Sequence, residues 1–383
     1  MDPLITKKHE EFREQVRAFS EKEIKPLAAE LDEKSIFSTE LTEKMFDEGY
    51  LRIVTPESYG GIGMDTLSYI IAVEEIARID GSQAATVAAH NSLGQAPILA
   101  YGTEAQKKKF LPMLTTGKKL WAFGLTEPNA GSDSNNTETI AELQDKHWMI
   151  NGKKIYITNA ASDMSGGVTV QAVTGDRGNG MKELSVILVP RETPGYSCEA
   201  IDSKMMWRGA DTGRIYFNNV KVPEDYILGE RGKGSKIMLA TLDGGRLSIA
   251  AMGLGLAQGA FEMAMDYAAK RVQFGKPIRS FQVNSFKLAD MATKIELARN
   301  LLYKACWLKD NKQPYGKEAA MAKLYTSEIA REIANESLQI HGAHGLMKDN
   351  PIERFYRDQR ILEIGEGTSE ILRLVISRHI GIR

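Results

Sequence analysis

The segment Ile361-Leu-Glu-Ile-Gly365-Glu366-Gly-Thr-Ser-Glu370 places one carboxylate between two glycines, directly after an apolar-rich run. Glycines let a ligand approach the backbone closely, and the Thr-Ser-Glu sequence that follows is typical of a helix start. The first N–H groups of such a helix would face an anionic ligand. From these residues alone, Glu366 is either a general base in a closed apolar pocket or a surface acid in a turn between helices.

The charge of the chain is nearly balanced, with 49 basic and 50 acidic side chains among 383 residues. This balance argues against nucleic acid or an anionic membrane as the main partner. Cys198 and Cys306 have neither CxxC nor Cys/His spacing, so we expect two buried thiols in a reducing compartment. The first residues lack an apolar signal core and no run of about 18 apolar residues occurs, which predicts a cytoplasmic protein without a membrane span.

Three regions of different pattern follow one another along the chain. Residues 1–120 carry apolar side chains at helical spacing, and residues 232–383 return to long helical patterns. Between them, residues 121–231 contain β-rich runs separated by Gly, Asn and Asp. Because these strands have no helices between them, we expect a small antiparallel barrel or sandwich rather than a βαβ sheet.

The same patterns place individual elements. Strands are expected at Trp148–Ile150, Lys154–Thr158, Val168–Val173, Leu184–Val189 and Arg214–Phe217, with a break at Asn151-Gly152. Long helices are expected at Ser235–Phe274, Gln282–Lys309 and Lys317–Ile340, and a last helix after Thr368. Gly253-Leu-Gly255 lies inside a helical pattern with no strand before it, so it predicts close helix packing rather than a dinucleotide site.

Four segments besides Glu366 are candidates for ligand contact. The loop Ala122–Asp133 is rich in small and hydroxyl residues, and Lys154–Ala160 ends a strand with an aromatic and a hydroxyl. Arg271-Val-Gln-Phe274-Gly275-Lys-Pro277, followed by Gln282, suits a pyrophosphate. Taken singly, the first segment fits an ordinary loop as well as a ligand site. The second is better explained as an ordinary strand, and the third as an Arg at a helix C-terminus.

The fourth segment is Gln339-Ile-His341-Gly342-Ala343-His344-Gly345. Its His-x-x-His spacing lacks a third ligand with fitting spacing, so we predict no metal site. A glycine-rich backbone that contacts a cofactor is the favoured interpretation.

In their order along the chain, these motifs resemble the acyl-CoA dehydrogenase family. The resemblance rests on six pieces and covers essentially the whole chain: Leu125-Thr-Glu-Pro128 with Ala130–Asp133, Tyr156–Asn159, Leu242-Asp243 with Arg246, Arg271 with Phe274 and Gln282, Gln339 with Gly342 and Gly345, and Glu366–Thr368 with Glu370. It implies three domains: an N-terminal helical domain (1–120), a central antiparallel β-barrel-like domain (121–231) and a C-terminal four-helix bundle (232–383).

The resemblance also implies FAD, an acyl-CoA substrate, an electron-transferring flavoprotein as electron acceptor, and a homotetramer. The residues implied to line the flavin ring or contact the flavin are Phe123, Leu125, Thr126, Ser132, Tyr156, Ile157, Thr158, Thr368 and Glu370. Those implied to hold the ADP half of a flavin bound mainly by a neighbouring subunit are Arg271, Phe274, Gln282, Gln339, Gly342 and Ala343. Those implied to bind the acyl-CoA are Ser132, Asp243, Arg246 and Gly367.

By the same resemblance Glu366 is the catalytic base that removes the α-proton of the thioester, while the flavin accepts the β-hydride at N5. Some relatives carry the base instead at the position of Gly245, which cannot act as a base here. Burial is expected to raise the pKa of Glu366 toward working pH.

The residue before the base is often Tyr in straight-chain enzymes of this family and is Gly365 here. A wider pocket of this kind suggests a short branched or alicyclic acyl group, such as a cyclohexane-carboxyl thioester. The alternatives are a straight short-chain acyl-CoA dehydrogenase, an acyl-CoA oxidase, and a flavin- or CoA-binding homologue without activity. His90 and Asn91, in an otherwise apolar helical stretch, either line the tail of the acyl group or form a capped polar spot in the core. The conformation of Met206-Trp207 stays open at this point.

Overall fold

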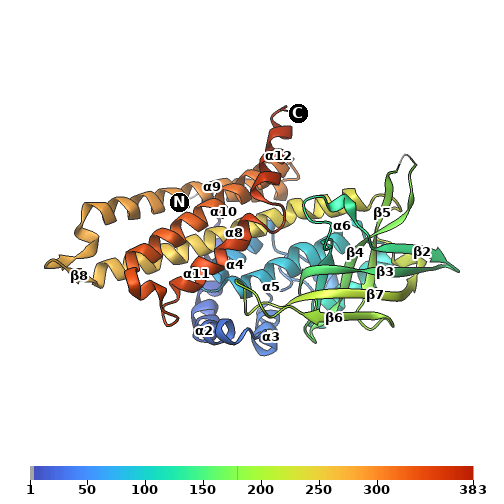
Figure 1. Ribbon diagram of the computed structural model, residues 1–383, viewed down its shortest axis with the longest axis horizontal. Coiled ribbons are helices and arrows are strands. Elements are labelled where there is room, and N and C mark those ends of the chain that lie inside the picture. The colour runs from blue at the N-terminus through green and yellow to red at the C-terminus, as the bar shows by residue number, and fades with distance from the viewer. Residues whose placement is uncertain (1–3, 179, 383) are drawn as a thin grey trace.

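The computed structural model describes residues 4–178 and 180–382. The first three residues, on which the predicted absence of a signal peptide partly rests, lie outside that range. Helical segments from both ends of the chain pack together, and a curled sheet lies at one end of them (Figure 1). The predicted order of a helical domain, a β domain and a second helical domain is therefore confirmed.

The N-terminal region is helical, as its apolar spacing predicts. Its helices are α1 (Lys7–Phe19), α2 (Lys25–Lys34), α3 (Thr39–Asp47), α4 (Thr66–Ala77), α5 (Gly81–Ala89), α6 (Ala96–Tyr101) and α7 (Glu104–Leu114). Two π-helical segments, η1 (Ser20–Ile24) and η3 (His90–Gln95), continue α1 and α5. Asp65 caps α4 by accepting the Ser68 N–H at 2.8 Å, which satisfies one of the free donors of a helix start. Every residue of α4 is buried, so this helix forms part of the core.

The middle region is one curled, mixed sheet. Its strands are β1 (Leu120–Gly124), β2 (Ile140–Gln144), β3 (His147–Thr158), β4 (Ser165–Asp176), β5 (Lys182–Pro190), β6 (Tyr196–Ala200) and β7 (Thr212–Pro223). They are paired in the order β1-β4-β2-β3-β7-β6, and β5 pairs with β4. The pairs β1–β4 and β2–β4 are parallel, so the expected purely antiparallel arrangement is wrong in these two places.

The expected break at Asn151-Gly152 does not end a strand. β3 runs through it, because β7 keeps pairing on both sides, with Ile150 opposite Val220 and Gly152 opposite Phe217. The register shift between these pairs is a bulge, and Gly152 accommodates it at φ 149°.

The C-terminal region contains three long helices that lie side by side (Figure 1). The elements are α8 (Gly234–Lys270), α9 (Gln282–Asp310), α10 (Gly316–His341), α11 (Ile352–Asp358) and α12 (Ser369–His379), with the short segments η7 (Gly342–Leu346) and η8 (Gln359–Glu363). The predicted extension of α8 to Phe274 is wrong. After Lys270 the chain forms a hairpin of β8 (Val272–Gln273) and β9 (Lys276–Pro277), in which Phe274 and Gly275 adopt the left-handed conformations that tight hairpins need.

Close packing explains the glycines inside α8. A Cβ on Gly253 would lie 2.9 Å from the Thr326 carbonyl of α10, and one on Gly255 would lie 2.2 Å from the Glu74 carbonyl of α4. The prediction that these glycines serve helix packing is confirmed. By length and composition α8 could cross a membrane, but 78% of its most apolar window is buried inside the fold, as in a core helix.

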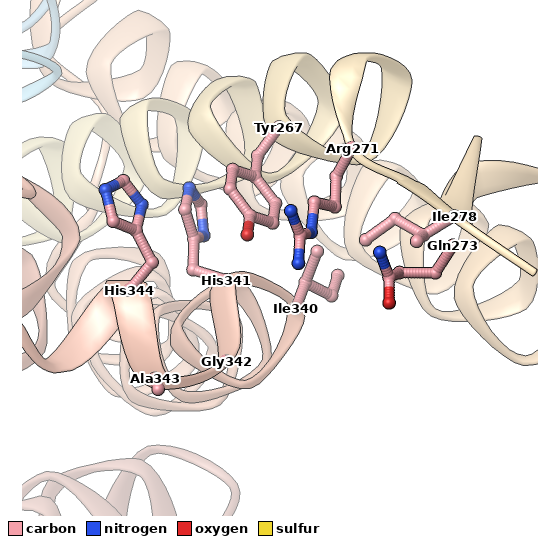
Figure 2. Close-up of a pocket in the computed structure, with 9 residues that line it drawn as sticks. All are labelled: Tyr267, Arg271, Gln273, Ile278, Ile340, His341, Gly342, Ala343 and His344. Atoms are coloured by element: carbon pink, nitrogen blue, oxygen red, sulfur yellow. The ribbon is translucent and has the colours of Figure 1, made fainter.

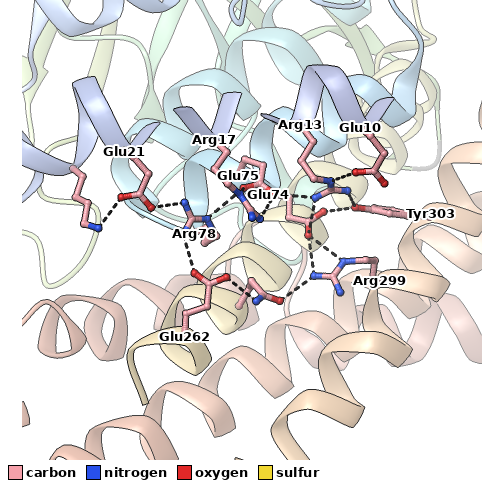
Figure 3. A network of polar contacts seen from close by, with 12 residues as sticks. Glu10, Arg13, Arg17, Glu21, Glu74, Glu75, Arg78, Glu262, Arg299 and Tyr303 are labelled. Carbon is pink, nitrogen blue, oxygen red and sulfur yellow. Dashed lines mark hydrogen bonds and ion pairs between the residues drawn. The ribbon is translucent and has the colours of Figure 1, made fainter. Parts of the chain in front are cut away.

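A buried network of ion pairs connects the N-terminal and C-terminal helices (Figure 3). Glu74 and Glu75 of α4 are almost fully buried. Arg299 of α9 contacts Glu74 at 3.1 Å, and Arg13 of α1 contacts Glu75 at 2.8 Å. Arg78, which ends α4, reaches Glu262 of α8 at 2.7 Å. Because a buried charge is costly when it is left alone, these pairs fix how α1, α8 and α9 meet α4.

Candidate active site

The carboxylate of Glu366 lies in a turn between two helical segments. η8 ends at Glu363, and α12 begins after Thr368, whose side chain accepts the Ile371 N–H at 3.2 Å. The predicted helix start after Glu366 is therefore confirmed. Glu366 has φ 53° and Gly367 has φ 102°, both in the left-handed region. A non-glycine residue with positive φ is disfavoured by about 1 to 2 kcal/mol and is found more often at functional sites.

The side chain of Glu366 points inward against α8. A Cβ built on Gly245 would lie only 1.9 Å from Glu366 Oε2, so the absence of a side chain at Gly245 makes room for the carboxylate. The same Cβ would lie 3.1 Å from Leu93 Cδ2, which places an apolar tip within about 5 Å of the carboxylate. Among the described residues, Oε2 is buried and has no hydrogen-bond partner. The surface-acid interpretation of Glu366 is thus wrong.

Burial raises the pKa of Glu366 to about 7, although Lys323 and Arg246 act in the opposite direction. Arg246 of α8 is 6% exposed and its Nη1 forms an ion pair with Asp243. Lys323 of α10 is fully buried and donates to the Gly367 carbonyl at 2.6 Å. The structure therefore brings together the predicted residues Glu366, Gly367, Arg246 and Asp243, and adds Lys323 to them.

The two predicted ligand segments of the middle domain also lie together. Ile155 N donates to the Thr126 carbonyl at 3.0 Å, which joins β3 to the loop after β1. Below this contact, the buried Lys154 ammonium bonds Glu127 Oε1 at 2.6 Å and the Leu125 carbonyl at 3.2 Å. Lys154 thus holds the main chain of the loop from the buried side through the Leu125 carbonyl. Glu127 compensates the charge of Lys154, and removing either partner would leave a buried charge alone.

Several side chains of this region remain accessible. Tyr156 is 67% exposed and has φ 61°, an unusual conformation for a bulky residue. Phe123, Thr126 and Thr158 are half-buried, Ser132 is exposed, and Leu125 and Ile157 are buried. The exposed aromatic ring of Tyr156 and the half-buried hydroxyls beside it fit a planar ligand that covers this surface.

A separate cavity of about 540 Å³ lies at the far end of α8. Its walls are formed by Tyr267, Arg271, Gln273, Ile278, Ile340, His341, Gly342, Ala343 and His344. Arg271, Tyr267 and His341 point toward the same space from two different elements (Figure 2). The Tyr267 ring stacks on His341 at 4.5 Å and on His344 at 6.0 Å between centroids. Three predicted residues, Arg271, Gly342 and Ala343, line this cavity.

The remaining predicted residues of this group lie outside the cavity lining. Phe274 is 94% exposed at the tip of the hairpin, and Gln282 and Gln339 are exposed. Because α8 rises about 1.5 Å per residue, Arg246 and Arg271 lie about 38 Å apart along it. The cavity at Arg271 is thus well separated from the Glu366 site of the same chain.

His90 and Asn91 form a satisfied polar cluster in the core. His90 contacts the Leu114 carbonyl at 2.8 Å and accepts the Trp121 N–H at 3.2 Å, while Asn91 accepts the Ile53 N–H at 3.1 Å. A role of these two residues in contact with a ligand tail is not supported.

Three smaller features of the sequence can be compared with the structure. Trp207 lies in a left-handed conformation, and its backbone N–H donates to Oδ1 of buried Asp358 at 2.8 Å, which fixes the loop at Met206-Trp207. The expectation of two buried thiols is right for Cys306 and wrong for Cys198, which is half-buried in β6. Within residues 4–178 and 180–382, no group of three or more His, Cys, Asp or Glu side chains could hold a metal ion.

Sequence reasoning gave no role to Tyr267 or Lys323, and it considered His341 and His344 only as members of the glycine-rich segment, not for their rings. The signal for Tyr267 was present, because it precedes Arg271 by one helical turn and must share its face. No pattern marked Lys323, since lysines on an amphipathic helix usually face water.

Comparison with known proteins decides the family. Residues 6–118, 122–220 and 232–381 match the N-terminal, middle and C-terminal domains of acyl-CoA dehydrogenase. The chain belongs to the acyl-CoA dehydrogenase family. As an acyl-CoA dehydrogenase it is an FAD-dependent oxidoreductase that acts on CH–CH groups.

Full-length relatives agree with this assignment. A probable acyl-CoA dehydrogenase of Bacillus subtilis is 47% identical and covers 98% of both chains. A short-chain specific acyl-CoA dehydrogenase of Clostridium acetobutylicum is 43% identical, over 99% of this chain and 100% of the relative. The structure of butyryl-CoA dehydrogenase from Megasphaera elsdenii is 42% identical, with a TM-score of 0.95 over 99% of this acyl-CoA dehydrogenase and 100% of that chain.

The residues present fit FAD. The exposed ring of Tyr156 offers a surface for a flat heterocycle, and the cavity at Arg271 offers a guanidinium and stacked aromatic rings for a pyrophosphate and a base. Glu366 Oε2 is buried and, within the part of the chain that the structure describes, has no hydrogen-bond partner, so it is an acceptor that a ligand could use.

Proposed function

We propose that this acyl-CoA dehydrogenase converts a short acyl-CoA thioester into the 2-enoyl-CoA, with Glu366 as the base that removes the α-proton. The observation that carries the proposal is the buried Oε2 of Glu366, which has no protein partner among the described residues and lies against the side-chain-free Gly245. A carboxylate with a pKa of about 7 is matched to proton transfer near neutral pH.

Each part of the site then has a physical task. The α-hydrogen of a thioester is a weak acid, so its removal needs a positioned base and a hydrogen-bond donor for the developing negative charge on oxygen. The N–H of Glu366 is our candidate donor, and one such donor is worth about 3 to 4 kcal/mol. FAD, when bound, supplies the hydride acceptor for the β-hydrogen.

Binding residues are proposed in three groups. Phe123, Leu125, Thr126, Ser132 and Tyr156–Thr158 form the surface for the flavin ring, and Thr368 and Glu370 contact the flavin from α12. Arg271, Phe274, Gln282, Gln339, Gly342 and Ala343 hold the ADP half of a flavin that belongs mainly to a neighbouring subunit. Ser132, Asp243, Arg246 and Gly367 bind the acyl-CoA.

The separation of about 38 Å along α8 supports binding of one flavin by two subunits. Exposed apolar side chains on α9, such as Val283, Phe286 and Leu297, suit burial against another copy of the chain. We therefore propose a homotetramer with domains at 1–120, 121–231 and 232–383. We also propose that it works in the cytoplasm and passes electrons to an electron-transferring flavoprotein.

The acyl group is proposed to be short. The Clostridium and Megasphaera relatives are named for short-chain and butyryl substrates, which favours a linear four-carbon thioester. One observation favours a branched or alicyclic group instead: the nearest neighbour of a Cβ on Gly365 would be Ile361, at 3.5 Å, so a side chain could be accommodated there and its absence leaves room next to the base.

The decisive test is anaerobic bleaching of the flavin in the purified holoenzyme by a panel of linear, branched, cyclic and dicarboxylic CoA thioesters. We expect the yellow colour to be lost with short thioesters and the matching enoyl-CoA to appear. A holoenzyme that stays yellow with every member of the panel contradicts the proposed function, and rapid oxygen consumption identifies an oxidase instead.

We expect kcat/KM for the best substrate to rise with pH and to level off above an apparent pKa of about 7. The direction follows because Glu366 must be ionised to accept a proton, and its burial raises the pKa from the ordinary 4.5 to about 7. The measurement is the pH dependence of the initial rate at low substrate concentration. An acid limb near pH 4.5 contradicts a buried base.

The variant Gly365→Tyr is expected to lower kcat/KM for branched and cyclic thioesters by about tenfold relative to butyryl-CoA. The substituted ring fills the space beside the base, and the backbone tolerates it because Gly365 is not in the left-handed region. The measurement is kcat/KM for both classes in the variant and the wild type. An unchanged ratio shows that position 365 does not shape the acyl pocket.

A further inference from the structure

We propose that Lys323 is a positioning residue for the base: its ammonium holds the Glu366–Gly367 turn in place and puts a buried positive charge beside the carboxylate. This proposal rests on the proposed role of Glu366. Lys323 lies in the middle of α10, and its side chain is fully buried although it belongs to one of the most strongly hydrated residue types.

The contact that anchors Lys323 is specific. Its Nζ donates to the Gly367 carbonyl at 2.6 Å, across 44 residues of sequence. This carbonyl belongs to the second of two consecutive left-handed residues, and α12 begins directly after it with the Thr368 cap. The positive φ of Glu366 is unfavourable, and a strained conformation persists only where its surroundings fix it. The contact from Lys323 fixes this turn from outside.

The charge of Lys323 is free to act on Glu366. A buried ammonium normally pairs with a carboxylate, but among the described residues Lys323 forms no ion pair. Its field therefore reaches Glu366 through a region of low dielectric. Burial lowers the pKa of Lys323 to about 8, and Glu366 opposes this shift. The same interaction opposes the rise in the pKa of Glu366.

Other charged or titratable groups face this pair from the neighbouring elements. Arg246 of α8 acts on both partners, and the buried Tyr69 hydroxyl of α4 interacts with Glu366. Glu363 of η8 and Glu370 of α12 act on Lys323. Two cations act on Glu366, and one of them, Arg246, forms an ion pair with Asp243. Lys323 has no such carboxylate partner among the described residues, so its charge is not compensated by an ion pair.

The test compares the variants Lys323→Met and Lys323→Gln in the holoenzyme. Both remove the charge, and the amide of Lys323→Gln keeps a donor for the Gly367 carbonyl. We expect the acid limb of kcat/KM to move up by about one pH unit in both, because a nearby cation favours the ionised carboxylate. At high pH, we expect kcat to fall further in Lys323→Met than in Lys323→Gln.

The matched control is Arg331→Gln, two turns further along α10. Arg331 also ties α10 to η8, through Glu363 at 2.8 Å, but on the exposed surface. We expect its acid limb to coincide with that of the wild type. If the acid limbs of both Lys323 variants coincide with that of the wild type, the proposal is overturned.

A second measurement does not depend on turnover. The loss in Tm caused by Lys323→Gln is measured in the wild type and in the Glu366→Gln background, at pH 7.5 and pH 5.5. We expect the loss at pH 7.5 to be smaller in the Glu366→Gln background, and the two losses to become equal at pH 5.5, where Glu366 is protonated. Equal losses at pH 7.5 contradict the charge interaction even if the dehydrogenase reaction itself is not found.

Discussion

Replacing Glu366 by Gln is expected to leave the FAD-bound protein folded and to lower kcat for acyl-CoA dehydrogenation by at least about 100-fold. The amide has nearly the same shape as the carboxylate but cannot accept a proton. Gly245, which carries no side chain, offers no replacement base on the other side of the site. The measurement is the turnover rate with the best short thioester, together with the flavin content from the absorbance spectrum.

Stability provides the control for Glu366→Gln. The pKa of Glu366 is raised in the folded state from the ordinary 4.5 to about 7, so the folded state holds this proton more tightly than the unfolded state. The corresponding stability is fully present below pH 4.5 and is lost as the pH rises to about 7. We therefore expect Glu366→Gln to gain in Tm relative to the wild type between pH 4.5 and 7. Near-normal turnover in this variant removes Glu366 from the mechanism.

Replacing Gly245 by Ala is expected to lower kcat/KM by about 100-fold with little loss of stability. The new Cβ would lie 1.9 Å from Glu366 Oε2 and 3.0 Å from its Cδ, so the carboxylate must move away. A displacement of about 1 Å of a reacting group can cost about 100-fold in rate. The fold tolerates the change because the displaced atoms end a flexible side chain, and Ala is favoured over Gly in a helix by about 1 kcal/mol.

The matched control is Gly244→Ala, one residue earlier in α8. A Cβ at Gly244 would meet only Lys309 Nζ, at 3.6 Å, which is an ordinary contact. We expect this variant to keep wild-type kcat/KM and KM, with a Tm equal to or slightly above that of the wild type, because Ala is favoured over Gly in a helix. Full activity of Gly245→Ala would show that the carboxylate does not react from the position seen in the structure.

Much of the fold followed from local patterns. The helical stretches, the change to β structure near Trp121 and the helix start at Thr368 are visible because amphipathic spacing and capping residues act over a few neighbours. The strands β1, β2 and β6 were missed. β2 and β6 are short, and most of their residues are exposed or only half-buried, so they lack a strong apolar alternation.

The errors at Asn151-Gly152 and at the end of α8 have different causes. An Asn-Gly pair often makes a hairpin turn, but here the long partner strand β7 keeps β3 continuous across it. Beyond Lys270 the apolar spacing continues, yet Gly275 and Pro277 favour a hairpin. At Asn151-Gly152 the pairing with β7 outweighed a turn signal, and after Lys270 a backbone preference outweighed the periodicity of the side chains.

The sequence by itself determined which carboxylate stands between glycines before a helix start, the order of the three regions, and the family to which these motifs belong. Only the tertiary structure decided that Glu366 turns inward onto Gly245, that Lys323 is buried beneath the same turn, and that Arg271 lies at the other end of α8. The physical reason is that burial and charge coupling depend on which helices meet. Residues 245, 323 and 366 come together only when α8, α10 and the turn before α12 pack against one another.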